Sequence, residues 1–530
     1  MHDIAICVRR SLAAFVIIVV AGLLAAGPLA AQELHVAVRS GPSAIDPHFS
    51  ALGTHTGAMK NIYEALVWRN ENLQLEPGLA LSWTPVDPLT WEFKLRPDVK
   101  FHDGSDFVAD DVKASVDRVP GAGGPDGGAG FFVKSIAEVV VVDPHTVRFK
   151  TKVPAPDLPF DLAGLFIVSH AARDAKVEDF NSGKAAIGTG PFRFVSWQPK
   201  GDLVLERFDG YWRGKAAYEK ATFSEISDDA ARVAALLSGR VDLINYVPPA
   251  DVARLGGDKK VAVFQGASAY QFFLWPDLAE TSPLVTDLDG KPLAQNPLRD
   301  PRVRQALSLA INREVIAGQV MEGRATPARQ LAPEGFFGTL PDAPPLAFDL
   351  AKAKQLLAEA GYPQGFAIAL HCTSDRLPND GQVCSALGQM FAKAGIRTAV
   401  NATPKAVLFP AWVKRKYVLS MLGWGNLNGE TGYTLGAIVH SNDGKQDLGS
   451  SNHTGYANPA LDKVIEEAVQ TADEVGRKAL LQQAMTLALA DLPLIPIVTL
   501  ATSWAGTAGK VSYVPRVDED TLAYYVRPAN

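Results

Sequence analysis

Histidine, aspartate and serine stand together in the run His102-Asp103-Gly104-Ser105, which is the arrangement in this chain most suggestive of catalysis. A catalytic triad needs side chains that converge from separate segments of the chain. The letters of this run are consecutive and read as a turn. We therefore expect it to be structural.

Metal binding is the other chemistry that histidines can support. His48 and His55 lie in one loop, and His440 and His453 lie in another, so each pair can approach one ion. Two histidines do not make a complete protein metal site. The sequence also lacks a Gly-x-Ser-x-Gly elbow, a His-Glu-x-x-His helix and a Cys-x-x-Cys pair. We expect no enzyme activity, no metal and no cofactor, and a secreted hydrolase is the remote alternative.

Length and composition describe a large globular protein. The chain has 530 residues, 47% apolar and 20% charged, which predicts two or three domains. The formal net charge of −6 disfavours nucleic-acid binding. We expect a monomer without a nucleic-acid partner.

The N-terminus has the order of a secretory signal peptide. Arg9 and Arg10 precede a continuously apolar stretch over residues 12–26, and small residues follow up to Ala31. We predict cleavage after residue 31 and a periplasmic protein, exported by the general or the twin-arginine route. Cys7 precedes the apolar stretch, so we do not expect a lipoprotein. An uncleaved membrane anchor is the alternative.

Two cysteines, Cys372 and Cys384, remain after that cleavage. In an oxidising compartment they can form a disulfide, or they can be two separate buried thiols.

Strand and helix signals alternate along the chain. Strands are predicted at residues 34–38 and 91–95, and a hairpin at 139–149 around Asp143-Pro144-His145. Helices are predicted after capping residues, in the order Asp228, Asp300, Asp349 and Asn458. The glycine-rich run at residues 121–130 lacks a phosphate-binding ending and is expected to be a mobile loop. The alternation indicates α/β lobes.

One long run and five shorter segments carry a resemblance. The run is YEALVWRNENLQLEPGLALSWTPVDPLTWEFKLRPDVKFHDGSDFVADDVKASVDR at Tyr63–Arg118. The segments, in order, are GTGPFRFVSW, ALLSGRVDLI, DPRVRQALSLAINREVI, AKAKQLLAEAGY and YANPALDKVIEEA, between residues 188 and 468. Together they resemble family 5 of the bacterial extracellular solute-binding proteins, the dipeptide-, oligopeptide- and nickel-binding proteins of ABC importers.

This resemblance implies an α/β, two-lobed periplasmic binding protein of type II, the Venus-flytrap architecture, with an extra domain inserted in the first lobe. The implied division is a signal peptide at 1–31, lobe I at 32–65, 190–275 and 496–530, an accessory domain at 66–189, and lobe II at 276–495. A small peptide or peptide-like solute would bind between the lobes and pass to an ABC permease. An opine-like compound, an oligosaccharide or a metal chelate is the alternative ligand.

The resemblance also implies candidate ligand-binding residues. In peptide-binding relatives an aspartate follows a Gly-Trp pair and holds the peptide ammonium; here the pair is Gly423-Trp424, and Leu427 stands where the aspartate is expected. Glu430 is a possible substitute, although we expect it to face solvent or to cap a turn. Arg376 stands where the family places a carboxylate-binding arginine, and a surface or inter-lobe salt bridge with Asp375 or Asp380 is its alternative role. The other candidates are Trp424, Gly425, Asn426, Thr54, His55, Tyr270 and Trp275. For Thr54 and His55 an exposed turn is the alternative, and for the three aromatic residues it is ordinary core packing.

Overall fold

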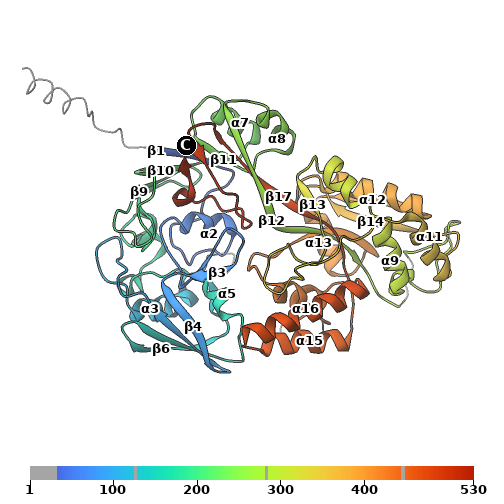
Figure 1. Cartoon of the computed structure of the whole chain (residues 1–530), viewed down its shortest axis with the longest axis horizontal. Helices are drawn as coiled ribbons and strands as arrows, with labels where there is room; N and C mark the ends of the chain where they lie inside the picture. The colour runs from blue at the N-terminus through green and yellow to red at the C-terminus, as the bar shows by residue number, and fades with distance from the viewer. Residues whose placement is uncertain (1–32, 125–127, 281–283, 443, 445–447, 530) are drawn as a thin grey trace, which may run out of the picture.

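Two long antiparallel strands, β12 (Val261–Pro276) and β17 (Ile495–Thr507), cross the middle of the molecule and connect its two halves (Figure 1). The computed structural model describes residues 33–124, 128–280, 284–442, 444 and 448–529. Both strands belong to a sheet ordered β15-β14-β16-β12-β17-β11-β1-β10-β9-β8, with β13 also paired to β17. The register between β12 and β17 shifts between Ala267 and Gln271, so the ladder is interrupted where the sheet passes from one half to the other.

The half that contains β1 is called the first lobe. Its strands are β1 (Glu33–Val38), β8 (Phe192–Trp197), β9 (Asp202–Arg207), β10 (Lys220–Glu225) and β11 (Leu243–Asn245). Its helices are α2 (Gly53–Met59), α6 (Val177–Asn181), α7 (Asp229–Leu237) and α8 (Pro249–Gly256). Strand β1 pairs in parallel with β10 and β11. The C-terminal strands β18 (Val511–Ser512) and β19 (Arg527–Pro528) pair with each other.

A second body, called the accessory body, comprises residues 66–167, whose buried side chains form a core of their own. Its antiparallel sheet has the order β4-β5-β7-β6, with β4 at Ala80–Asp87, β5 at Thr90–Leu95, β6 at Ile136–Asp143 and β7 at Thr146–Thr151. It also contains β2 (Val67–Arg69), β3 (Leu75–Pro77), α3 (Ala109–Ala122), α4 (Gly130–Val133) and α5 (Leu158–Leu162). The rings of Phe93 and Phe149 meet edge to face in its centre, with centroids 5.2 Å apart.

The half on the other side of the crossing strands is called the second lobe. Its strands are β13 (Ala325–Pro327), β14 (Phe366–Thr373), β15 (Ile396–Thr403) and β16 (Leu419–Gly425). Its helices are α9 (Pro301–Ala310), α10 (Arg313–Val315), α11 (Leu350–Glu359), α12 (Asp380–Ala394), α13 (Lys405–Val413), α14 (Thr431–Thr434), α15 (Pro459–Gln470) and α16 (Glu474–Asp491). Helices α15 and α16 lie beside the accessory body (Figure 1).

The predicted local elements are confirmed where the structure describes them. The strands at 34–38 and 91–95 and the hairpin at 139–149 form as β1, β5 and β6–β7. Each predicted helix begins at its predicted cap; for example, the Asp228 carboxylate accepts a hydrogen bond from the backbone N–H of Ala231 at 2.7 Å. Cys372 and Cys384 form a disulfide with Cα atoms 6.3 Å apart.

Three predictions are not tested by the helices and strands described above. The signal peptide and its cleavage point lie outside the described residues, as does the centre of the glycine-rich run, residues 125–127. The domain boundaries stay predictions. Within the part of the chain that the structure describes, no helix is both long and apolar enough to cross a membrane.

Candidate functional site

A cavity of about 260 Å³ lies where the first lobe faces Tyr270 of the crossing strand β12 and Leu427 of the second lobe. Apolar side chains of the first-lobe sheet form one wall: Val38, Trp197, Leu203 and Phe223. Carboxylate side chains form another: Glu225, Asp518, Glu519 and Asp520. A concave site with an apolar wall and a few polar groups is typical of small-molecule recognition.

Glu519 is held at the cavity wall by neutral donors. The hydroxyl of Tyr246 donates to its Oε2 at 2.7 Å, and the hydroxyl of Ser268 donates to its Oε1 at 2.6 Å. Both Glu519, with φ 64°, and Tyr246, with φ 47°, adopt the left-handed backbone region that non-glycine residues rarely occupy. Burial raises the pKa of the Glu519 carboxyl above its ordinary value.

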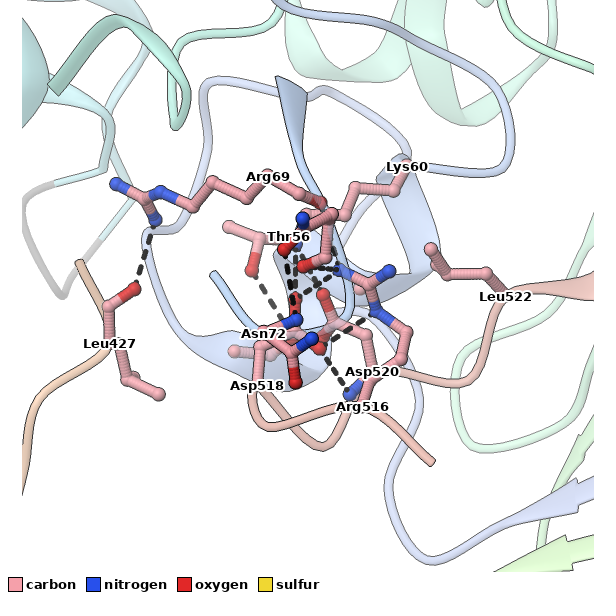
Figure 2. A network of polar contacts seen from close by, with 12 residues as sticks. Thr56, Lys60, Arg69, Asn72, Leu427, Arg516, Asp518, Asp520 and Leu522 are labelled. Carbon is pink, nitrogen blue, oxygen red and sulfur yellow. Dashed lines mark hydrogen bonds and ion pairs between the residues drawn. The ribbon is translucent and has the colours of Figure 1, made fainter. Parts of the chain in front are cut away.

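The two neighbouring aspartates, in contrast, are paired with cations (Figure 2). Lys60 Nζ lies 3.0 Å from Asp518 and 2.5 Å from Asp520, and Arg516 Nη2 lies 2.7 Å from Asp518. Burial opposes ionisation of Asp518, but Arg516 and Lys60 together lower its pKa. Burial and the adjacent Asp518 charge raise the pKa of Asp520 to about 7. Arg516 also donates to the carbonyls of residues 69 and 70, which ties this C-terminal segment to the accessory body.

Arg376 lies in the second lobe, between β14 and α12, and is not one of the residues that line the cavity. Its Nη1 donates to the carbonyl of Gly423 at 2.7 Å, and its guanidinium lies 5.1 Å from the ring centroid of Phe409. Among the described residues no carboxylate lies within 4 Å of this guanidinium. Asp380 accepts a hydrogen bond from the backbone N–H of Arg376, and among the described residues the side-chain salt bridge that was the alternative role of Arg376 is not formed. Burial raises the pKa of Tyr270, the Glu519 charge raises it further, and the Arg376 charge opposes both.

The Gly423-Trp424 pair lies near the end of strand β16. The indole of Trp424 stacks on Tyr433 with centroids 5.5 Å apart. Gly425 pairs with Tyr270 across the sheet, and a Cβ at this position would lie 2.5 Å from the Tyr270 ring. Asn426 is buried, and its amide donates to the Glu430 carbonyl and the Thr434 hydroxyl. Trp424 and Gly425 are therefore near the crossing strand, whereas the Asn426 side chain shapes its own loop.

Leu427 is 37% exposed and lines the cavity. Its carbonyl accepts a hydrogen bond from Arg69 Nη1 at 3.0 Å, so this loop contacts the accessory body directly (Figure 2). The position that lacks the expected aspartate is thus at the cavity, but it brings an apolar side chain and no charge.

The expectation for Glu430 was wrong. Glu430 neither faces solvent nor caps a turn; it is buried and forms an ion pair with Arg477 of α16. Arg477 also donates to the carbonyl of Pro156 in the accessory body at 3.2 Å. Because its charge is neutralised by the ion pair with Arg477, Glu430 does not replace the missing aspartate.

The remaining candidates fall into two groups. Thr54 is exposed on α2 and lines the cavity. His55 points the other way: it is fully buried, and its Nε2 lies 3.0 Å from the Asp46 carbonyl. Trp275 is also buried, donates to the Leu422 carbonyl and packs edge to face on Trp412. The side chains of His55 and Trp275 therefore belong to the core and not to the candidate site.

The histidines that could have approached a metal ion contact protein groups instead. His48 contacts the Phe166 carbonyl and Arg118, and burial lowers its pKa to about 4. His440 lies 3.3 Å from Glu466. In the described ranges no three His, Cys, Asp or Glu side chains are grouped as an ion would require.

Sequence reasoning missed the residues of the C-terminal wall. Asp518, Glu519 and Asp520 form an acidic triplet in the segment assigned to lobe I, and this triplet was the available signal. Tyr246 and Arg69 gave no comparable signal, because their roles depend on contacts between residues hundreds of positions apart.

Comparisons with known proteins agree with this architecture. The glutathione-binding protein GsiB of Shigella dysenteriae is 28% identical over 498 residues, covering 91% of each chain. HbpA2 of Haemophilus parasuis superposes with a TM-score of 0.80 at 25% identity, over 94% of this chain and 100% of its own. The unliganded open form of MppA, a periplasmic murein tripeptide binding protein, gives a TM-score of 0.80 at 21% identity, over 94% and 98% of the two chains.

The family profile described as "Bacterial extracellular solute-binding proteins, family 5 Middle" matches residues 74–446. That match covers more than half of the chain and includes most of the accessory body and most of the second lobe. The chain therefore belongs to family 5 of the bacterial extracellular solute-binding proteins.

Proposed function

We propose that this protein is the periplasmic substrate-binding component of an ABC importer that captures a small peptide or peptide-like solute between its two lobes. The observation that carries the proposal is the cavity between the first lobe, Tyr270 and Leu427. Tyr270 and Glu519 line this cavity, and the charges of Glu519 and Arg376 both act on Tyr270, with opposite effects on its pKa. A peptide carries opposite charges at its two ends and suits such a pair.

The crossing strands explain how capture and release can occur. β12 and β17 are the continuous connections between the lobes, and their ladder is interrupted between Ala267 and Gln271. Small changes in backbone angles at such a point rotate two rigid bodies relative to each other. The loaded protein would then be recognised by the permease. We further propose export by a cleaved signal peptide, a monomeric state and a purely binding role without catalysis.

Ligand-dependent stabilisation tests the proposal. A solute that binds only the folded state at 100 times its Kd stabilises that state by about 2.7 kcal/mol, which raises the unfolding temperature. The screen uses a library of di- and tripeptides together with glutathione. At least one member should raise the unfolding temperature, and no response across the whole library would contradict the peptide assignment.

Native mass spectrometry of freshly purified protein separates peptides from other solutes. A retained mass that matches a short peptide or glutathione supports the proposal. A retained opine-like compound, oligosaccharide or metal chelate would replace the ligand assignment while leaving the transport role in place.

A further inference from the structure

The acidic wall of the cavity consists of Glu225, Asp518, Glu519 and Asp520, and not all of these carboxylates are paired with cations. Asp518 and Asp520 share the two cations Lys60 and Arg516, so this part of the wall is close to neutral. Glu519 lies between them in sequence, but among the described residues no Lys or Arg comes within 4 Å of it. A carboxylate without a cationic partner therefore lines the cavity.

The Glu519 carboxylate also has unused capacity to accept hydrogen bonds. An ionised carboxylate offers about four lone-pair directions, and the hydroxyls of Tyr246 and Ser268 occupy two of them. These two donors fix the orientation of the carboxylate before a solute arrives. The remaining directions suit an ammonium group, which brings three donors and the missing positive charge.

Backbone conformation supports a role beyond packing. Glu519 and Tyr246 both have positive φ, and their side chains bond to each other across 273 positions of sequence. Strained backbone persists where the surrounding structure enforces it, and it clusters at functional sites. Here the strain coincides with the carboxylate of the acidic wall that is fixed by two hydroxyls and not by a cation.

The opposite wall of the cavity brings no counter-charge for an ammonium. Leu427 is apolar, and the charge of Glu430 is neutralised by its ion pair with Arg477. A ligand ammonium in this cavity would therefore find its counter-charge in the first lobe.

We propose that Glu519 is the specificity-determining residue that receives the primary ammonium group of the solute, whose carboxylate end is directed toward Arg376. This inference rests on the proposed capture of a peptide-like solute. It assigns the ligand class as small molecules that carry a free amino group and a carboxylate, and it predicts that blocking the amino group abolishes recognition.

The first test is isothermal titration calorimetry with the wild-type protein, which shows whether recognition requires the free amino group. The probes are glutathione, di-alanine and tri-alanine, each alongside its N-acetylated form. Acetylation should weaken binding at least about 30-fold, as expected for the loss of a buried charged hydrogen bond. Equal affinity of the free and acetylated forms would overturn the inference, and this result does not depend on any variant folding correctly.

Two variants then test whether Glu519 is the residue that binds the ammonium group. Glu519→Gln keeps the size of the side chain and should reduce affinity for the free-amine probe about 30-fold while leaving the already weak acetylated probe unchanged. Glu225→Gln is the matched control, because Glu225 is a carboxylate on the same wall that accepts from the Gly41 N–H. An unchanged affinity in Glu519→Gln, or an equal loss in Glu225→Gln, would refute the role of Glu519.

The outcomes also separate this inference from the function on which it rests. If a free-amine probe binds the wild type but Glu519→Gln binds it equally well, the transport proposal stands and the assignment of Glu519 fails. If none of the free or acetylated probes binds the wild type, and the peptide library also gives no response, the peptide assignment fails and the inference fails with it.

Discussion

The buried ion pair between Glu430 and Arg477 gives a prediction about stability that can be worked out from the structure. Both side chains are at most 5% exposed. Glu430→Gln keeps the shape but leaves the Arg477 guanidinium buried without its counter-charge. Removing one partner of a buried pair typically costs about 3–5 kcal/mol. We expect Glu430→Gln to lower the free energy of unfolding by that amount.

The assay is urea denaturation followed by tryptophan fluorescence, with Asp117→Asn as the matched control. Asp117 pairs with Lys113 at 2.8 Å on the surface of α3, where the two side chains are 34% and 45% exposed. Such a pair contributes about 0.5 kcal/mol or less. The double variant Glu430→Gln/Arg477→Met removes both charges and should recover much of the loss. A cost for Glu430→Gln within about 1 kcal/mol of the control would refute the reasoning, because a buried unpaired charge costs more than that.

Three further outcomes follow from the same structure. The pKa of Asp520 is about 7 in the folded protein and 3.8 in an unstructured chain, so near neutral pH the folded state binds a proton that the unfolded chain lacks. Buried neutral histidines such as His48 act in the opposite direction, so the effect is measured against Asp520→Asn: from pH 8 to pH 6 the free energy of unfolding in urea should rise by about 1.4 kcal/mol in the wild type relative to the variant, and an equal pH dependence of the two would contradict this. The Cys372–Cys384 disulfide closes a loop of 12 positions, so Cys384→Ser should cost about 3 kcal/mol, and a midpoint of denaturation equal to wild type would contradict this. Arg376→Ala should weaken binding of peptides with a free carboxylate by about 2–5 kcal/mol but leave their C-terminal amides unaffected in titration calorimetry, and equal losses for both would remove Arg376 from the site.

Local elements could be predicted from the sequence because their causes are local. Asp228 begins a helix since its carboxylate reaches an N–H three residues later, and the alternation at residues 34–38 already predicts the strand β1. Contacts between distant segments could not be read in this way. Glu430 was expected to face solvent or to cap a turn, yet it is buried against Arg477, 47 positions away.

The candidate site shows the same difference between features that could be predicted from the sequence and features that depend on contacts in the folded structure. Thr54, Tyr270 and the Leu427 position were found through the resemblance to the family, and all three line the cavity. His55 was selected together with Thr54 because the resemblance places this segment facing the ligand, but one residue along a helix turns the side chain by about 100° and into the core. Glu519 was overlooked because its importance depends on which neighbouring carboxylates are paired with cations, and pairing is a property of the folded structure.

Blocking the cavity tests most directly the claim that the solute is held between the lobes. Thr54 is exposed at the second position of α2 and faces the cavity, so Thr54→Trp would fill the space without disturbing a buried contact. Titration calorimetry would compare wild type and Thr54→Trp with the peptide that gives the largest thermal shift, and thermal unfolding without peptide would confirm that the variant is folded. The account predicts that the folded variant no longer binds the peptide measurably. Binding with wild-type affinity by a folded Thr54→Trp protein would contradict it.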